Sequence, residues 1–246
     1  MQFENTNVYN FEGSLRGMRN PMNSWDRSDS FFGVVDLYDG NTLNDMAEKW
    51  GDEENSYKWL KSNGILRASD SYDGLFEVAF IGPADMKLAQ NLIRAGAEHA
   101  KFLRQIFVSV DITAPLYWWK EFDTYKVGTV ANSTSTMHKL SAIPITKEIF
   151  DFDYVDDPNV EAFKTVVING CEGLREKFIE TADPAYWRAL VQILPNAYLQ
   201  KRTVTMSYAN LRSIYFQRKE HKLKEWRQLC EDWLPTLPYS KELITL

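Results

Sequence analysis

The stretch "QIFVSVDITAPLYWWKEF", from Gln105 to Phe122, contains two kinds of hydrophobic periodicity in direct succession. Its first half carries β-branched residues at every second position: Ile106, Val108, Val110 and Ile112. Such alternation predicts a β-strand with one buried face. The second half, "APLYWWKEF", follows without a break and is typical of a helix. A strand that leads directly into an aromatic helix predicts a mixed α/β (α+β) fold.

Helical spacing recurs along the rest of the chain, and one more strand is expected. The expected helices are Leu43–Trp50, a segment after Pro83 that ends at Gly96, Val160–Thr181, Pro184–Leu194, Tyr208–His221 and Lys222–Leu234. The segment "RTVTMS", Arg202–Ser207, is expected to form a short strand. Because no repeat or linker divides the sequence, we expect a single domain over residues 1–246 that is helix-rich toward its C-terminal end.

The composition is that of an acidic globular protein with many aromatic side chains. Hydrophobic residues make up 44% of the 246 residues, and 28 basic against 34 acidic residues give a net charge of −6. An acidic chain is a poor binder of nucleic-acid polymers. Residues 201–227 differ, because eight Lys or Arg and two Glu give a local balance of +6 that suits a small anion. The 8 Trp favour a thick core, a subunit interface or a stacking pocket.

Several classes of site are not expected. Cys171 and Cys230 both lie in helical patterns, so we expect reduced thiols rather than a disulfide. The three histidines have no metal-ligand spacing among themselves or with the cysteines, and no metal site is expected. No apolar run reaches the ~18–20 residues that span a bilayer, and no signal sequence is visible. A cytoplasmic protein without a membrane partner is therefore expected.

The polar run "NSTST", Asn132–Thr136, admits two interpretations. Its hydroxyl and backbone donors suit a phosphate group. Alternatively, it is a surface loop in which Ser and Thr hydrogen-bond to the local backbone. Tyr125 and Lys126 precede the run, and they become acid–base groups only where the protein desolvates them.

Two arginines are candidate anion ligands. Arg218 extends the apolar stripe of the expected helix Tyr208–His221, where a guanidinium is costly unless it meets a carboxylate or a ligand. Its planar fork suits phosphate as well as carboxylate. Arg202 begins the expected strand beside Lys201, where a solvated surface position is the alternative. The sequence leaves both pairs of interpretations open.

About half of the chain resembles the flavin-dependent thymidylate synthases. The family's core begins with a helix that ends in Gly, followed by a short loop, a strand and an Ala-Pro helix. The motif Arg-His-Arg comes next, and a Ser follows it by seven residues. The counterparts here are "LIRAGAEH", "FLRQIFVSVDIT", "APLYWWKEF" and "TYKVGTVANST", ungapped from Ala114 to Leu140. The segment "LPNAYLQKRTVTMSYANLRSIYFQRKEHKLKEW" is similar to the family's Leu-Pro strand, substrate arginine and Arg-Ser helix. The resemblance places a synthase-like core at residues 83–246 and leaves residues 1–80 as a divergent N-terminal part.

The chain departs from the family pattern at its functional motif. Thr124-Tyr125-Lys126 stands where the family has Arg-His-Arg, Thr134 where it has Ser, Asn132 where it has Glu, and Gln105 where it has a flavin-contacting His. The resemblance implies a nucleotide site formed by Asn132, Ser133, Thr134, Ser135, Thr136 and Arg202. It implies flavin contacts from Gln105, Thr124, Tyr125, Lys126, Arg218 and His221. It implies chemistry at Tyr125, Lys126 and Thr134.

The resemblance implies a homotetramer with FAD as cofactor and a dUMP-type pyrimidine deoxynucleotide as substrate. The reaction would be reductive methylation through the flavin after one-carbon delivery from a folate. The hydroxyl run would face Arg202 from another subunit. One alternative is a non-catalytic protein that sequesters or senses a nucleotide after losing the flavin-clamping arginines. Another is a structural homo-oligomer without a ligand.

Overall fold

The computed structural model describes residues 1–36, 64–68 and 75–246, and the expected helix Leu43–Trp50 lies outside them. The chain divides into two compact units, each built from several segments. The first unit comprises Met1–Asn7, Ser109–Met206 and Leu223–Gln228. The second unit comprises Val8–Val108, Ser207–Lys222 and Leu229–Leu246.

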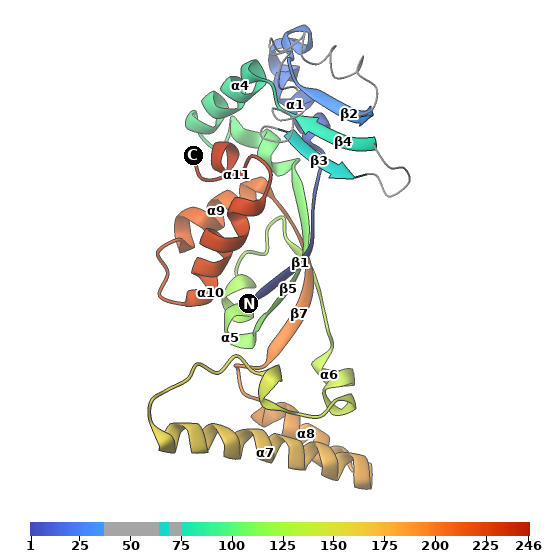
Figure 1. Cartoon of the computed structure of the whole chain (residues 1–246), viewed down its shortest axis with the longest axis vertical. Helices are drawn as coiled ribbons and strands as arrows, with labels where there is room; N and C mark the ends of the chain where they lie inside the picture. Colours follow the sequence, from blue (N-terminus) through green and yellow to red (C-terminus); the bar gives the residue numbers. More distant parts are fainter. Residues whose placement is uncertain (37–63, 69–74) are drawn as a thin grey trace. The chain divides into compact units, whose positions relative to one another are not determined.

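A four-stranded sheet forms the framework of the first unit (Figure 1). Its strands, in spatial order, are β1 (Gln2–Tyr9), β5 (Phe107–Pro115), β7 (Leu199–Ser207) and β6 (Val130–Ser133). The predicted alternation is confirmed in β5, because Val108, Val110 and Ile112 are fully buried and the residues between them are not. The sheet therefore has one core face and one polar face.

Helices α5, α7 and α8 of the first unit lie where the sequence predicts helices. They are α5 (Leu116–Phe122), α6 (Thr136–Lys139), α7 (Pro158–Thr181), α8 (Pro184–Ile193) and α10 (Lys224–Arg227), with short 3-10 turns at Leu140–Ala142 and Lys147–Ile149. The long helices α7 and α8 lie side by side (Figure 1). Asp157 begins α7 by accepting a hydrogen bond from the Asn159 N–H, so the acidic run before this helix supplies its N-cap.

The Trp-rich helix α5 supplies the centre of the core in this unit. Trp118, Trp119 and Trp226 are 0% exposed. The ring centroid of Trp118 lies 4.8 Å from that of Trp119 and 4.9 Å from that of Trp226. Of the three expectations for the aromatic residues, a thick core is thus confirmed for these tryptophans.

The prediction of one regular α-helix over Lys222–Leu234 is wrong. It consists of α10, a π-helical segment η6 (Gln228–Trp233) and a 3-10 turn η7 (Leu234–Thr236). The buried residues recur as adjacent pairs at intervals of four: Glu225–Trp226, Leu229–Cys230 and Trp233–Leu234. Intervals of four exceed the α-helical period of ~3.6 residues, and the wider π turn keeps the later pairs buried.

The second unit combines helices with a three-stranded antiparallel sheet. Its strands are β2 (Phe31–Asp36), β4 (Leu75–Phe80) and β3 (Gly64–Ala68), in that spatial order. Its helices are α1 (Phe11–Arg19), α4 (Pro83–Arg94), α9 (Tyr208–Arg218) and α11 (Ser240–Leu243), with 3-10 turns η1 (Asn20–Met22), η2 (Trp25–Arg27) and η3 (Ala100–Arg104). The expected helix from Tyr208 is confirmed but ends at Arg218, before His221. Gly96 follows α4 with φ +111°, as its predicted role at a helix end requires.

A buried ion pair fixes the N-terminal segment of the second unit. Arg19 Nε donates to Asp85 Oδ1 at 2.5 Å, and the side chains are 6% and 0% exposed. The hydroxyls of Ser28 and Ser30 donate to the other carboxylate oxygen at 2.6 Å and 2.5 Å. A buried carboxylate with this many donors is fully satisfied, so the cluster is structural.

Candidate functional site

The hydroxyl run and Arg202 meet at one edge of the four-stranded sheet. Strand β6 pairs antiparallel with β7, and Ser133 lies opposite Arg202 while Asn132 lies opposite Thr203. Opposed residues project to the same face, and successive residues project to opposite faces. Ser133 therefore shares the face of Arg202, and Asn132 does not. The expectation of a plain loop is wrong for Asn132 and Ser133, which belong to the strand.

Arg202 is held by three neighbours within the first unit. Its Nη1 donates to Asp123 Oδ1 at 2.7 Å, and its Nε donates to Gln200 Oε1 at 3.0 Å. Its guanidinium carbon lies 4.3 Å from the ring centroid of Trp119. The Arg202 side chain is 16% exposed, whereas that of Asp123 is 51% exposed. We call Arg202, Asp123, Gln200, Trp119 and Ser133 the Arg202 cluster.

Local folding of α5 explains how this cluster is built. Trp119 and Asp123 are four residues apart, so they lie on one face at the end of the helix, and the Asp123 N–H donates to the Trp119 carbonyl at 2.8 Å. Trp119 Nε1 donates to the Gln200 carbonyl at 2.9 Å, which ties α5 to β7. Gln200 Nε2 in turn donates to the Thr134 carbonyl at 2.9 Å. The cluster is thus connected to the hydroxyl run through the backbone.

The rest of the hydroxyl run continues from strand into helix. The Thr134 N–H donates to the Lys201 carbonyl at 2.9 Å and extends the pairing by one residue. Ser135 is half-buried, and its carbonyl accepts from the Lys139 N–H at 3.1 Å as α6 begins at Thr136. Ser133 and Thr134 are therefore brought to the Arg202 cluster, whereas Ser135 and Thr136 lead away from it.

The local charge of +6 in residues 201–227 does not form one positive patch. Lys201 lies on the opposite face from Arg202, where its Nζ is 2.9 Å from Glu4 and 3.4 Å from Asp111. Hydrogen bonds from Thr203 and Asn5, together with the charge of Lys201, lower the pKa of Asp111. Lys224 pairs with Asp151 and Asp153. Lys201, Arg202 and Lys224 are thus each paired with acidic residues from other segments.

Thr124, Tyr125 and Lys126 follow Asp123 in a turn after α5. The Thr124 hydroxyl donates to the Glu121 carbonyl at 2.7 Å. The Tyr125 ring lies against Trp226 at 5.8 Å and against Phe122 at 6.4 Å, measured between ring centroids. Lys126 is exposed. In this turn the Tyr125 ring therefore packs on the core, and the Lys126 side chain is exposed to solvent.

The other residues assigned to flavin by resemblance belong to the second unit. Gln105 is exposed at the end of η3, and its carbonyl accepts a hydrogen bond from Asn10 Nδ2 at 2.9 Å. Arg218 is half-buried at the end of α9, and its carbonyl accepts from the His221 N–H at 2.9 Å. Helix α9 buries Leu211 and Ile214, so the predicted apolar stripe that leads to Arg218 is confirmed.

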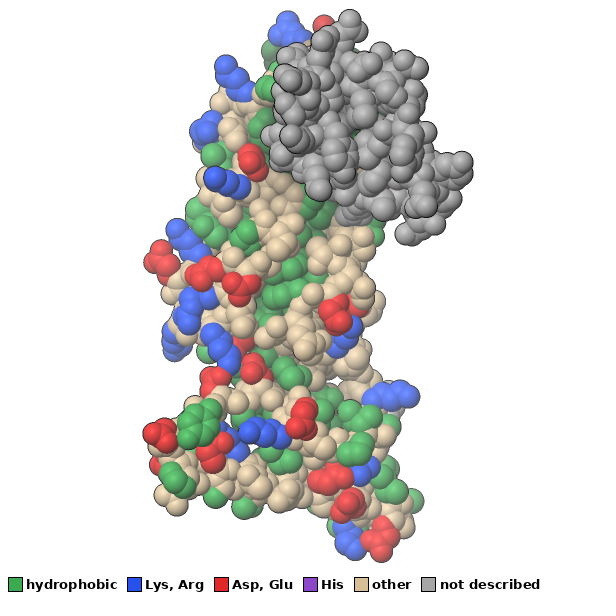
Figure 2. Space-filling model, viewed as in Figure 1, with side chains coloured by type: hydrophobic (Ala, Val, Ile, Leu, Met, Phe, Trp, Pro, Cys, Tyr) green, Lys and Arg blue, Asp and Glu red, His purple; other side chains and the backbone are tan. Residues whose placement is uncertain are grey.

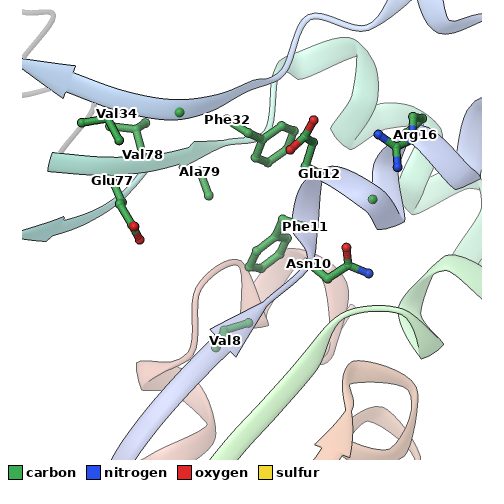
Figure 3. Close-up of a pocket in the computed structure, with 12 residues that line it drawn as sticks. Val8, Asn10, Phe11, Glu12, Arg16, Phe32, Val34, Glu77, Val78 and Ala79 are labelled. Atoms are coloured by element: carbon green, nitrogen blue, oxygen red, sulfur yellow. The ribbon is translucent and has the colours of Figure 1, made fainter. Parts of the chain in front are cut away.

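A cavity of about 390 Å³ in the second unit was not predicted from the sequence (Figure 3). Phe11 of α1 and Phe32 of β2 contribute aromatic walls, and Val8, Val78 and Ala79 contribute aliphatic ones. Glu12, Arg16 and Glu77 lie at its margin. Its lining comes from four separate elements, so no sequence motif marks it. None of the residues selected from the sequence lines it.

A second feature missed from the sequence is a buried tyrosine–carboxylate contact in the first unit. The Tyr117 hydroxyl donates to Glu225 Oε1 at 2.5 Å, and Glu225 is 1% exposed. Burial and the Glu225 carboxylate both raise the pKa of Tyr117 well above its usual value. The contact joins α5 to α10 through a buried carboxylate, which assigns it a structural role.

Within residues 1–36, 64–68 and 75–246, no three His, Cys, Asp or Glu side chains come together as a metal would require. In the same ranges, no helix is both long and apolar enough to cross a bilayer. Cys171 and Cys230 are buried free thiols, as the sequence predicts.

The fold matches solved structures of one enzyme. The flavin-dependent thymidylate synthase ThyX of Helicobacter pylori, in complex with FAD and dUMP, superposes with a TM-score of 0.52 and 16% identity over 86% of this chain and 95% of that chain. A second structure of ThyX from this organism with FAD and dUMP gives a TM-score of 0.53 and 15% identity, covering 87% and 96%. No protein-family model matches the sequence, and neither does any curated protein. The likeness establishes a flavin-dependent thymidylate synthase-like fold.

Proposed function

We propose that the chain binds a pyrimidine deoxynucleotide of the dUMP type, with Arg202 as the phosphate anchor. The observation that carries this proposal is the register of β6 and β7, which sets the Ser133 hydroxyl and the Arg202 guanidinium on one face. The structurally similar ThyX of Helicobacter pylori holds dUMP, which supports a ligand of this class. Arg and Ser together offer the charge and the donors that a phosphate monoester needs.

Each member of the cluster has a part in this proposal. Trp119 and Gln200 fix the plane of the guanidinium, so little side-chain entropy is lost when a ligand binds. Arg202 Nη2 donates to none of the described residues and remains available to a phosphate oxygen. Ser133 supplies a neutral donor beside it. Asn132, Thr134, Ser135 and Thr136 are assigned to the phosphate and base by the family resemblance alone.

The side chains that stand at the family's flavin-binding positions suit a flavin less well than those of the family. The Thr124 hydroxyl is engaged by its own helix end, and Tyr125 packs on the core. Lys126 is the one cation where the family has two arginines and a histidine, and an ammonium cannot replace a bidentate guanidinium. Nucleotide binding without flavin chemistry is therefore the function that these side chains support best.

The second candidate is FAD-mediated reductive methylation of a dUMP-type nucleotide. It is favoured because the similar solved structures contain both FAD and dUMP. When bound, the flavin would supply the hydride, and the protein would position the nucleotide. Tyr125, Lys126 and Thr134 are the side chains that the resemblance assigns to this chemistry. A protein that sequesters or senses a nucleotide needs none of these roles.

A homo-oligomer, with a tetramer as the family's arrangement, is part of the same proposal. Helix α7 exposes large apolar side chains that nothing in its own unit covers, among them Phe163 at 66% and Val166 at 65%. Hydrophobic side chains also reach the surface over α7 and α8 (Figure 2). Exposed apolar residues gathered on one helix are typical of a protein–protein contact.

Calorimetric titration of dUMP tests the nucleotide site. We expect wild type to bind, and Arg202→Ala to bind about 10- to 150-fold more weakly, because a charge-assisted hydrogen bond contributes ~1.5–3 kcal/mol. Arg188→Ala removes an exposed arginine of the same unit and should bind like wild type. Equal binding by folded Arg202→Ala would show that the phosphate lies elsewhere.

An absorbance spectrum of the purified protein separates the two candidates. A flavin spectrum, with oxidation of the reduced bound flavin coupled to dTMP formation, would support the enzyme. Binding of dUMP by a colourless protein that does not take up added FAD would support the nucleotide-binding protein.

A further inference from the structure

The proposed phosphate anchor already has an internal counter-ion. Asp123 Oδ1 accepts from Arg202 Nη1 at 2.7 Å, so the pair carries no net charge. The two side chains differ in their surroundings, because that of Arg202 is 16% exposed and that of Asp123 is 51% exposed. A phosphate that approaches Arg202 from solvent therefore meets the Asp123 carboxylate at the same guanidinium.

We propose that Asp123 determines the affinity and charge preference of this site by competing with the ligand phosphate for Arg202. The inference rests on the proposed function, since it concerns the same guanidinium. Two like charges at one cation repel each other, and this repulsion weakens binding of a dianionic phosphate more than that of an uncharged ligand. Asp123 is thus a specificity-determining residue that touches the ligand's anchor.

The geometry allows Asp123 to give way while Arg202 stays in place. Arg202 keeps its hydrogen bond to Gln200 and its position over Trp119 when the carboxylate is withdrawn. Gln200 is itself fixed by its bond to the Thr134 carbonyl. Asp123 lies at the last turn of α5, and its described side-chain partner is Arg202. Removing its charge therefore leaves an oriented cation with more free donors.

The same reasoning predicts which ligands respond to Asp123. A phosphate monoester should gain affinity when the carboxylate is neutralised, because one repulsion is lost and a neutral amide oxygen competes less strongly than a carboxylate for the Arg202 donor. Inorganic phosphate should gain in the same direction. Deoxyuridine, which has no phosphate, should not gain. The ratio of dUMP to deoxyuridine affinity is therefore the quantity that Asp123 controls.

The test is titration of dUMP, deoxyuridine and inorganic phosphate into wild type, Asp123→Asn and Glu4→Gln. Asparagine keeps the shape of aspartate and removes its charge. We expect Asp123→Asn to bind dUMP about tenfold more tightly than wild type, with deoxyuridine affinity unchanged. Glu4→Gln is the matched control, because it neutralises a carboxylate that pairs with Lys201 on the other face of the sheet. It should leave dUMP affinity unchanged.

The outcomes separate this inference from the proposed function. If wild type and folded Asp123→Asn bind dUMP equally through Arg202, the role of Asp123 is overturned and the nucleotide site stands. If Asp123→Asn binds dUMP and wild type does not, and if the double variant with Arg202→Ala loses that binding, the inference is supported. If neither protein binds dUMP or phosphate, both are overturned. Asp123→Ala repeats the comparison should Asp123→Asn fail to fold, and it is expected to tighten dUMP binding as well.

Discussion

Arg202 lies over the indole ring of Trp119, with its guanidinium carbon 4.3 Å from the ring centroid. The tryptophan is fully buried and tied to β7 through its Nε1, so the surface on which Arg202 rests belongs to the core. A cation over a tryptophan face contributes ~0.5–1 kcal/mol when exposed and ~2 kcal/mol when desolvated. The core residue therefore orients the proposed anion ligand.

Arg202→Lys tests whether orientation or charge alone matters at this position. A lysine keeps the charge but has no planar fork with which to reach Gln200 and Asp123 while stacking on Trp119. We expect the free energy of unfolding to fall by ~1 kcal/mol and dUMP affinity to fall about tenfold. Urea denaturation and calorimetry measure the two effects, with Arg188→Lys as the control. Wild-type affinity in Arg202→Lys would mean that the site recognises charge only.

The strands β5 and β7 and the helices α5, α7, α8 and α9 were predictable because their signals are local, whereas β1 and β6 were not predicted. Val108, Val110 and Ile112 alternate with less buried residues since β5 has one core face, and the alternation is visible without knowledge of the partner strands. The helix α5 is equally evident from its aromatic residues. The π-helical turn after Arg227 was not predictable, because residues with buried spacing of three and four fit an ordinary amphipathic helix as well.

The sequence predicted which residues belong to the candidate site, but it did not predict which of them contact one another. The family resemblance selected Arg202 and Ser133, but their pairing depends on the register of β6 with β7. Asp123 is 79 residues from Arg202 in the sequence and has no motif of its own. Likewise, the local charge of residues 201–227 did not show that Lys201, Arg202 and Lys224 pair with Glu4, Asp123 and Asp153, which lie far away in the sequence.

Tyr117→Phe is predicted to destabilise the first unit. The variant leaves the Glu225 carboxylate, 1% exposed, without the hydroxyl that donates to it at 2.5 Å. The loss of a buried partner costs ~1–3 kcal/mol. Because burial and Glu225 raise the pKa of Tyr117, the hydroxyl stays protonated up to the ordinary tyrosine pKa of ~10. The stability difference from wild type should therefore be constant between pH 7 and pH 9, as urea denaturation can measure.

Tyr154→Phe is the control for that measurement, since Tyr154 is 76% exposed. It should change stability by less than ~0.5 kcal/mol. A Tyr117→Phe protein as stable as Tyr154→Phe would mean that the hydroxyl of Tyr117 contributes nothing to folding.

Both cysteines are predicted to resist thiol reagents in the folded protein. Burial, with a smaller contribution from Glu231, raises the pKa of Cys230 to about 11, and burial raises the pKa of Cys171. The thiolate is the reactive form, so little of it is present at pH 8. We expect no labelling by iodoacetamide within an hour at pH 8, and two labels per chain in guanidinium chloride, measured by mass spectrometry. Rapid labelling of either cysteine in the native protein would contradict its burial.

Helix α7 is predicted to form a contact between copies of the chain. Phe163 and Val166 are exposed, and Gly170 and Gly173 continue the same face with open space around each α-carbon. Glycine within a helix costs ~1 kcal/mol relative to alanine, a cost that a close helix–helix contact would offset. Val166→Asp would put an unpaired charge in that contact, so we expect it to dissociate the oligomer at micromolar concentration.

Light scattering on a sizing column measures the mass of wild type, Val166→Asp and the control Gln192→Asp, which adds the same charge at an exposed position of α8. We expect an oligomer for wild type and the control, and a smaller species for Val166→Asp.

Gly170→Ala gives a second readout. In a monomer the added methyl group meets open space and should raise the free energy of unfolding by ~1 kcal/mol. In a tight interface it should instead weaken assembly. A monomeric wild type that Gly170→Ala stabilises would leave α7 as a solvent-exposed helix.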